Sequence, residues 1–408
     1  MLSPYTVLDL TDERGELATM MLGDLGADVI KIEPPQGSAS RRMGPFLEDG
    51  PESERSLNFF AFNRNKRGIT LDLSADEGRA ALLRLVEKAD FLIESAPPGE
   101  MAELGIGFDV LRRTNPRLVY VAITAFGQDG PHAGFAASDL TLAAMGGQMS
   151  VQGNPDRPPV RVSLPQVWLH ASSEAAVAAL TAHARMLSSG EAQFVDVSAQ
   201  TAMVSTMLHA RVAHAIQGRD FNRGGSDLQL GTMSLPMVYE CADGYIVMLQ
   251  NGAMLTKMVP WLVEDGVIPE EWIEGEDWPT YDIRLVMQQP LNYSIEDVLG
   301  AVGRYVRPYS KRELLERGLR EGVTIAPVNT VEELAGFRHL EERGYWLTAP
   351  LPNGRQIPVP GVFARLSETP MTVRRWAPGL GEHSEAILGR TLGLSADEIG
   401  AAGGGGKG

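Results

Sequence analysis

The feature that most constrains the fold is an alternation of strand, helix and strand within residues 7–41. An apolar run at residues 7–10 is followed by Thr11 and Asp12, two residue types that cap helices. A segment with apolar residues at helical spacing comes next, and a second strand-like run occupies residues 28–33. Such a short unit forms a right-handed crossover, so we expect two parallel neighbouring strands with the helix on one face.

The first strand-to-helix turn lacks the glycine fingerprint of dinucleotide-binding proteins. Gly15 is the only glycine in this turn, whereas the fingerprint needs three glycines at fixed spacing. The chain therefore begins like a nucleotide-binding fold, but we do not expect it to hold a dinucleotide on this helix.

The rest of the chain predicts an α/β protein with two domains. Further buried strands are expected at residues 69–73, 90–94, 118–124 and 193–198, and an alanine-rich helix at 164–187. From residue 219 the composition shifts to Gly, Asp and Trp. We predict a Rossmann-like parallel-sheet large domain at 1–218, a smaller α+β domain at 225–325, a return segment at 326–400 that completes the large domain, and a disordered tail at 401–408.

Composition excludes several classes of function. The chain has 36 basic and 52 acidic residues and a formal charge of −16, which argues against binding to nucleic acid or to an anionic membrane. Cys241 is the only cysteine, so we predict neither a disulfide framework nor a cysteine-rich metal site. Because the sequence shows no signal peptide and no run long enough to span a bilayer, we expect a cytoplasmic protein.

Several motifs, in one order along nearly the whole chain, resemble the class III CoA-transferase family. They include LGADVIKIEPP followed by Arg41, NRNKRGITLDL at residues 63–73, GQDGP at 127–131, QFVDVS at 193–198, and GEHS at 381–384. This family contains formyl-CoA and carnitine-CoA transferases and α-methylacyl-CoA racemases. The resemblance implies an interlocked dimer that takes a CoA thioester and a carboxylic acid as substrates, with no permanently bound cofactor and no metal.

The resemblance also implies where CoA is held. In family members the arginine at the position of Arg41 contacts CoA, and Asn65 and Lys66 belong to a cation-rich motif that is a plausible anion site. The plain alternatives are a solvated surface arginine and a basic turn.

A second expected contact is the loop that holds the adenosine end of CoA. It is usually Glu-Asn-Phe-x-Pro-Gly in the family, but Ser95 and Ala96 stand here before the Pro-Gly turn that ends at Gly99. We therefore expect Ser95, Ala96 and Gly99 to contact CoA, with a weaker or different adenine contact.

The residue expected to carry the chemistry is missing. Transferases of the family use one aspartate, three residues after a proline at the start of the long helix, which attacks the thioester to form an anhydride and then an aspartyl-CoA thioester. Counting forward from Pro165, or backward from the strand at 193–198, puts Trp168 at this position. An indole has no nucleophilic oxygen, so the catalytic residue stays unknown.

A racemase mechanism and three surrogate residues are the alternatives to the missing aspartate. The racemase histidine position is occupied by Ser138, so both racemase bases are absent. His170 lies about 200° around the helix from Trp168, and Glu174 lies roughly 9 Å farther along the axis. Asp139 is near the expected site, although a role as a helix cap explains it as well.

Three roles follow from this pattern. The chain is the subunit without a nucleophile in a hetero-oligomer with an aspartate-bearing paralogue, or a divergent racemase, isomerase or lyase with a substituted acid or base, or a non-catalytic acyl-CoA-binding protein. In the first role another chain supplies the aspartate, and in the third role no aspartate is needed. A homodimer is the alternative to the hetero-oligomer. We take CoA transfer between carboxylic acids as the expected activity, because most family members are transferases.

Overall fold

The computed structural model describes residues 1–218, 220–230 and 233–404, and the chain divides into two compact units. The large unit comprises Met1–Met149, Arg161–Asp220 and Glu341–Gly408. The small unit comprises Ser150–Val160 and Phe221–Leu340. Compared with the predicted domains, the small unit includes an additional stretch at 150–160 and extends 15 residues beyond position 325, to Leu340.

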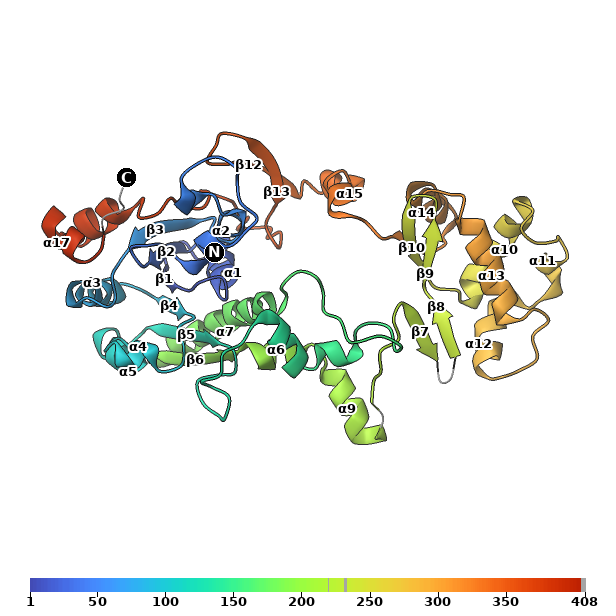
Figure 1. The fold of residues 1–408 in the computed structure, drawn as a ribbon, viewed down its shortest axis with the longest axis horizontal. Helices are drawn as coiled ribbons and strands as arrows, with labels where there is room; N and C mark the ends of the chain where they lie inside the picture. Colours follow the sequence, from blue (N-terminus) through green and yellow to red (C-terminus); the bar gives the residue numbers. More distant parts are fainter. Residues whose placement is uncertain (219, 231–232, 405–408) are drawn as a thin grey trace. The chain divides into compact units, whose positions relative to one another are not determined.

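The large unit is built on a six-stranded sheet in which every pairing is parallel. The strand order is β3-β2-β1-β4-β5-β6, and Figure 1 shows the strands in this sequence from β3 in blue to β6 in green. The strands are β1 (Thr6–Leu10), β2 (Asp28–Glu33), β3 (Lys66–Thr70), β4 (Phe91–Glu94), β5 (Val119–Thr124) and β6 (Gln193–Ser198). This is the order of doubly wound nucleotide-binding folds, so the predicted α/β class is confirmed.

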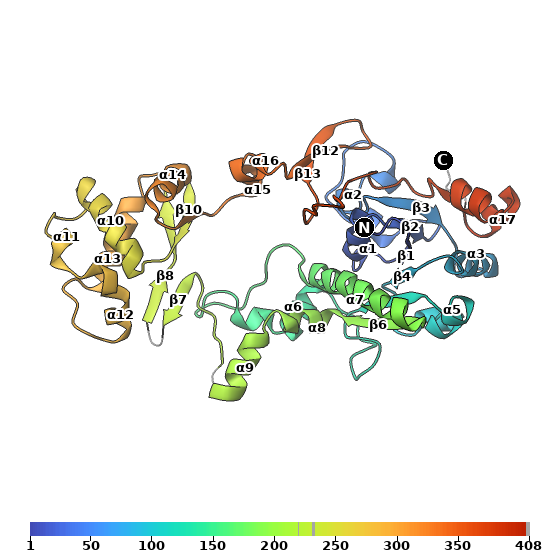
Figure 2. The ribbon, with the colours of Figure 1, turned by 180° about the vertical axis from the view of Figure 1, so that it is seen from behind.

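Successive residues of each strand face opposite sides of the sheet and enter two separate cores. Val7 belongs to a core that contains α1 and α7, whereas Leu8 belongs to a core that contains α3 and α5. Both faces are therefore apolar, as expected for a sheet covered by helices on both sides. Figure 2 shows the long α7 lying alongside β6, and α7 is in contact with both β5 and β6.

The helices of the large unit connect the strands and cover the two faces. They are α1 (Glu16–Asp24), α2 (Leu57–Phe62), α3 (Asp76–Val86), α4 (Glu100–Glu103), α5 (Phe108–Thr114), α6 (Asp139–Met145), α7 (Val167–Ser189), α8 (Ala199–Ser205), α9 (Leu208–Gln217) and α17 (Ala396–Ala401). A two-stranded hairpin, β12 (Trp346–Pro350) and β13 (Gln356–Pro360), and a π-helical turn at Glu385–Thr391 come from the returning chain.

The C-terminal segment covers the free edge of the sheet at β3. The N–H of His383 donates to the carbonyl of Gly68 over 2.8 Å, and the N–H of Thr70 donates to Ser384 Oγ over 3.3 Å. Ile387 and Leu388 then pack into the core that contains α3. The GEHS motif thus satisfies an edge that would otherwise expose backbone donors and acceptors.

The small unit is an α+β structure with its own core. Its three-stranded sheet has the order β11-β10-β9 and is antiparallel. The elements are β7 (Asp227–Leu230), β8 (Met233–Pro236), β9 (Val238–Cys241), β10 (Gly244–Met248), α10 (Gly252–Glu264), α11 (Trp272–Gly275), α12 (Tyr281–Val286), α13 (Ile295–Val306), α14 (Lys311–Glu321), β11 (Ile325–Pro327) and α15 (Val331–Ala335); α16 (Arg338–Glu342) crosses the boundary to the large unit. Trp261 and Tyr305 are buried at its centre.

Two local expectations were wrong. Helix α1 does not begin after Asp12 but at Glu16, with Gly15 at the cap position. The tail is ordered as far as it is described, because Ala402 is 1% exposed and its carbonyl accepts a bond from the N–H of Asp72. Residues 405–408 of the predicted disordered tail lie outside the described residues.

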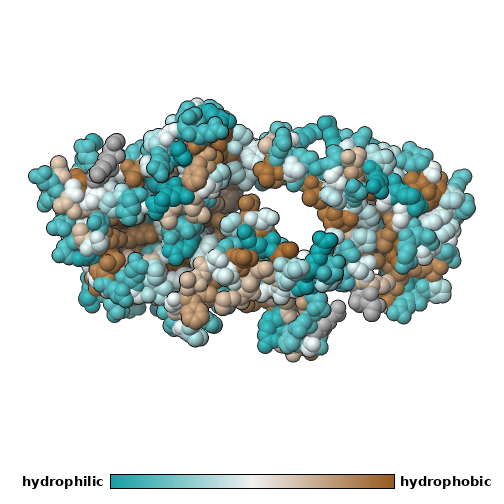
Figure 3. Space-filling model, in the orientation of Figure 1, coloured by the Kyte–Doolittle hydropathy of each residue, from teal (hydrophilic) through white to brown (hydrophobic). Residues whose placement is uncertain are grey.

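Polar residues dominate the surface on one face of the protein (Figure 3). On the face drawn in Figure 3, hydrophilic residues cover most of the surface and apolar residues form smaller patches between them. Among the described residues, no helix is both long enough and apolar enough to cross a bilayer.

The covered edge of β3 generates a testable prediction. A chain that ends at Trp376 should lose cooperative unfolding and aggregate, because backbone N–H groups of β3 become unpaired and part of a core is removed. Urea denaturation followed by fluorescence, together with size-exclusion chromatography, measures this. A chain that ends at Gly404 is the control and should unfold at the full-length midpoint. An unchanged midpoint in the shorter chain would show that the segment does not stabilise the sheet.

Candidate functional site

The strand order places a topological switch point at the carboxyl ends of β1 and β4. The chain turns to one side of β1 to form β2 and β3, and to the other side to form β4, β5 and β6. Ligands of open α/β sheets bind at such a topological switch point. Two segments leave the sheet here, the turn 11–15 after β1 and the loop 95–99 after β4.

Hydrogen bonds join these two segments. The N–H of Asp12 donates to Ser95 Oγ, and Ser95 Oγ donates to Asp12 Oδ1, both over 2.9 Å. Asp12 also accepts bonds of 2.6–3.1 Å from Nε and Nη2 of Arg14. Ala96 is half-buried, and Gly99, at φ +88°, is exposed with open space beside it. Of the predicted CoA contacts, Ser95, Ala96 and Gly99 therefore line the switch point.

Trp168 lies at the same place, in the first turn of α7. Its ring is half-buried against the adjoining core, and the guanidinium carbon of Arg14 is 6.0 Å from the ring centroid. One turn later, Ser172 Oγ donates to the carbonyl of Arg14 over 3.1 Å. The position expected to carry the nucleophile thus lies next to the switch point. It carries the indole of Trp168, and the guanidinium of Arg14 lies beside this ring.

Asp139 has a structural task. Its Oδ1 accepts the N–H groups of Gln166 and Val167 over 2.9 and 2.8 Å, which caps the start of α7. Helix α6, which we expected Asp139 to cap, is capped by Ser138 in a capping box with Thr141. A cap was therefore the right role but for the wrong helix.

The other two surrogate residues point away from this cluster. His170 is exposed on α7. Glu174 is also exposed and lines a groove of about 700 Å³ between α7 and β6, together with Thr181 and Asp196. Neither has a recorded contact with Arg14 or Asp12 in the described part of the chain, so the roles predicted for them stay predictions.

Glu94 is a buried acid at the switch point that the sequence analysis did not single out. It ends β4, is 3% exposed, and accepts bonds from the N–H of Ala96 and from the hydroxyl of Tyr120. Burial raises the pKa of Glu94 to about 7, although these bonds and the charge of Arg14 oppose the rise. The only sequence signal was an acidic residue at the end of an otherwise apolar strand.

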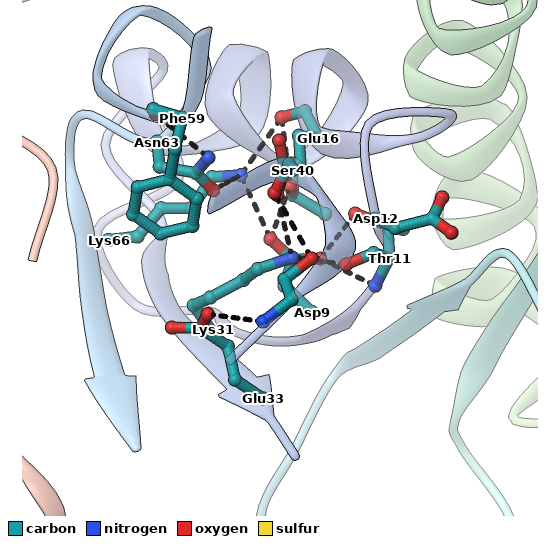
Figure 4. A network of polar contacts seen from close by, with 12 residues as sticks. Asp9, Thr11, Asp12, Glu16, Lys31, Glu33, Ser40, Phe59, Asn63 and Lys66 are labelled. Atoms are coloured by element: carbon teal, nitrogen blue, oxygen red, sulfur yellow. Dashed lines mark hydrogen bonds and ion pairs between the residues drawn. The ribbon is translucent and has the colours of Figure 1, made fainter. Parts of the chain in front are cut away.

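The predicted contacts Arg41, Asn65 and Lys66 lie below the surface instead. Figure 4 shows Lys66 in a buried polar network, where its ammonium group donates to Asp9 Oδ2, to Asn63 Oδ1 and to the carbonyl of Glu16 over 2.8–2.9 Å. Lys66 is 0% exposed, so all three of its donors are used inside the protein.

A second buried lysine completes this network. Lys31 lies 3.5 Å from Asp9 and 3.3 Å from Glu16, and it also donates to the carbonyl of Thr11. Burial alone would raise the pKa of Asp9, but Lys31 and Lys66 hold it well below its usual range. Asp9 is therefore a carboxylate, and its contacts with the two lysines tie three neighbouring strands to the first turn of α1.

Arg41 is equally engaged. Its Nε and Nη2 bind the two carboxylate oxygens of Glu33 over 2.6 and 2.7 Å, and it donates to the carbonyls of Ser53 and Pro378. With 2% exposure, Arg41 is not the solvated arginine of the plain alternative, and the geometry favours a structural role. Its contact with CoA stays a prediction.

Asn65 and the rest of the cation-rich motif also have partners within the chain. Asn65 is held at φ +62° and bridges Asp24, the carbonyl of Thr372 and the N–H of Arg374. Arg64 pairs with Asp24, and Arg67 pairs with Asp28. The sequence suggested an open anion site at this motif. In the described part of the chain, its cations and Asn65 are instead paired with acidic residues.

The glycine at position 15 is explained by steric contacts rather than by ligand binding. A Cβ atom at this position would lie 2.6 Å from Thr11 Cγ2 and 3.0 Å from Ile123 Cδ1. The turn therefore needs glycine because the strand and the helix approach closely at this point.

The first prediction from this geometry concerns Arg41. Arg41→Ala should lower the free energy of unfolding by about 3–5 kcal/mol, because Glu33 would stay buried without its partner. Denaturant unfolding measures this, and Arg42→Ala, at the exposed neighbouring arginine, should change the free energy by less than about 0.5 kcal/mol. Normal stability of Arg41→Ala combined with weaker CoA binding would instead support a direct contact to CoA.

The second prediction concerns Glu94 and pH. Because the folded state holds the Glu94 proton more tightly than the unfolded state, the cost of ionising this buried acid develops as pH rises from about 4.5 to about 7. Glu94→Gln, which keeps an acceptor for Ala96, should therefore stabilise the protein by up to about 3 kcal/mol at pH 8 and by little at pH 5. Unfolding midpoints across this range test it, and a pH-independent difference would contradict it.

Comparisons with known proteins identify the family of the chain. The family model described as CoA-transferase family III matches residues 2–384. The succinyl-CoA:(R)-benzylsuccinate CoA-transferase subunit BbsE of Thauera aromatica is 34% identical over 95% of this chain and 93% of its own length. The succinate–glutarate CoA-transferase of Agrobacterium fabrum is 31% identical over 92% of this chain and 91% of its own.

A solved structure gives the same result at the level of the fold. A CAIB/BAIF family protein from Brucella suis superimposes with a TM-score of 0.81 at 26% identity, over 95% of this chain and 98% of that one. The family match and the two relatives span both units of the chain. The protein with Trp168 at the start of α7 belongs to CoA-transferase family III.

Proposed function

We propose that this chain binds a CoA thioester and takes part in CoA transfer between carboxylic acids as a subunit without a nucleophile. The observation that carries the proposal is Trp168, which stands in the first turn of α7 beside the switch point. The anhydride mechanism needs a carboxylate oxygen there, and an indole cannot supply one. The aspartate then comes from a paralogous chain in a hetero-oligomer.

The side chains around Trp168 support this division of labour. Asp139 is held at the start of α7, close to Trp168 in the chain's fold, but its Oδ1 accepts two backbone N–H groups, those of Gln166 and Val167. Removing it from this cap would leave the start of the helix without its acceptor. His170 and Glu174 are exposed elsewhere on α7. The start of α7 is therefore well supported by hydrogen bonds, although it lacks the aspartate that the family's mechanism uses.

Names of relatives support both the reaction and the assembly. Relatives named as transferases use succinyl-CoA together with benzylsuccinate, D-citramalate or mesaconate. Two of the relatives are named as subunits, BbsE and the alpha subunit of a succinyl-CoA–L-malate CoA-transferase of Chloroflexus aurantiacus. We infer a short-chain carboxylic acid and its CoA thioester as substrates, with no cofactor bound permanently.

The CoA moiety is assigned to the loop after β4. Ser95, Ala96 and Gly99 leave the sheet at the switch point, and Gly99 has open space around it, which suits close approach by a ligand. Arg41, Asn65 and Lys66 stabilise the other side of the sheet, around β2 and β3. We further propose that the chain acts in the cytoplasm as half of an interlocked dimer.

One observation favours a second candidate, a divergent enzyme with its own acid or base. Glu94 lies at the switch point, and its pKa of about 7 suits proton transfer at neutral pH. This candidate predicts turnover by the chain alone. A plain acyl-CoA-binding protein predicts binding without turnover in any combination of chains.

The experiment uses the full chain alone and together with an aspartate-bearing paralogue. Alone, it should be stabilised by millimolar CoA, because a ligand that binds only the native state raises the melting temperature, yet it should not exchange CoA between succinyl-CoA and free acids. Co-expression should restore transfer, and Asp→Ala in the paralogue should abolish it.

Each alternative gives a different result in this experiment. Turnover by the chain alone would favour the divergent enzyme, and hydroxylamine trapping with mass spectrometry would then locate the acylated residue. Trp168→Ala distinguishes the roles of the indole: a lower melting temperature with an unchanged CoA response indicates packing, whereas an unchanged melting temperature with an altered response indicates a pocket wall.

A further inference from the structure

We propose that Arg14 recognises a carboxylate on the acyl group or on the acceptor acid, and thereby selects dicarboxylic substrates. This inference rests on the proposed function and adds to it a residue that determines specificity. Arg14 was not singled out from the sequence, and its importance comes from the three chain segments that meet around it.

The guanidinium of Arg14 is oriented but not fully used. Asp12 accepts from Nε and Nη2, so one edge of the planar group is held by an ion pair. Nη1 takes part in none of these bonds, and no other bond from it is recorded within residues 1–218, 220–230 and 233–404. The side chain of Arg14 is 29% exposed. The other edge of the guanidinium, formed by Nη1 and Nη2, is therefore left for a ligand. A carboxylate can accept two parallel hydrogen bonds from this edge.

The position of Arg14 is fixed from three sides. Its carbonyl accepts from Ser172 of α7, Asp12 is tied to Ser95 after β4, and its guanidinium lies beside the Trp168 ring. Little side-chain freedom is left to lose when a ligand binds, and such preorganisation increases affinity. Because the ring of Trp168 stands where the family's nucleophile is expected, a carboxylate on Arg14 lies within the reaction site.

The surrounding charges favour a carboxylate over the phosphates of CoA. Glu13 and Glu94 are the other acids near Arg14, and burial raises the pKa of both, to about 7 for Glu94. Their repulsion of a single negative charge is thus reduced, whereas a pyrophosphate would bring several charges next to Asp12. An uncharged acyl chain would leave the free edge of Arg14 without a partner.

The test compares thioesters that differ only in the terminal group. Isothermal titration should show that the wild-type chain binds succinyl-CoA at least about tenfold more tightly than butyryl-CoA, since hydrogen bonds to charged groups are worth that much. In Arg14→Gln, this preference should vanish while the affinity for butyryl-CoA and CoA stays within about twofold. Arg14→Lys keeps the charge without the fork and should retain part of the preference.

Free acids distinguish the two sources of the carboxylate. In the presence of CoA, succinate and butyrate are titrated against the wild type and Arg14→Gln. A loss of the succinate preference in the variant assigns Arg14 to the acceptor acid as well as, or instead of, the acyl group. The control is Arg112→Gln, which breaks an exposed ion pair with Asp109 on α5 and should leave every affinity unchanged.

The failure of this inference differs from the failure of the proposed function. No binding of CoA or either thioester by folded wild-type protein would overturn both. Binding of CoA with equal affinity for succinyl-CoA and butyryl-CoA would overturn only the role of Arg14. So would an Arg14→Gln variant, shown by circular dichroism to be folded, that keeps the wild-type preference.

Discussion

The large unit depends on neutralising two lysines that are buried within its sheet. Lys31 on β2 and Lys66 on β3 are both 0% exposed, and an ammonium group removed from water without a partner would be strongly destabilising. Asp9 on β1, which is the register partner of Lys31, and Glu16 on α1 supply the opposite charges. Satisfying this network requires the three strands and α1 to adopt one arrangement, and that arrangement fixes the turn 11–15.

The turn 11–15 at the candidate site is held in position by this network. Thr11 accepts from Lys31 and donates to Asp9, so the residue just before Asp12 is anchored inside the sheet. Asp12 and Arg14 then have a defined direction toward β4 and α7. A site that depends on hydrogen bonds between loops becomes rigid when its loops leave a rigid support. The main effect of the buried ion pairs is thus to fix the position of the turn 11–15, because their net contribution to the free energy of unfolding is small.

Sequence patterns predicted the strands well because these are local signals. The Val- and Ile-rich run of β5 and the crossover of β1, α1 and β2 needed only short-range periodicity and turn residues. The partners of charged residues were different, because Arg64 pairs with Asp24, 40 positions earlier, and Asp139 caps a helix that begins 28 positions later. No local pattern encodes such pairings. The cations of the motif at 63–67 therefore looked available for a ligand, whereas in the structure each is paired with an acidic residue of the chain.

The same distinction explains what Trp168 can and cannot indicate. Counting along the sequence located this residue at the start of α7, since helix positions are set locally, but it could not reveal that Arg14 lies beside its ring. In the fold, Trp168 and the partly free guanidinium of Arg14 lie side by side. An aspartate at position 168 would carry a charge able to compete with a substrate carboxylate for Arg14, whereas an indole leaves the free edge of Arg14 uncontested. The loss of the nucleophile that we propose therefore fits the proposed carboxylate recognition by Arg14, which an aspartate at position 168 would oppose.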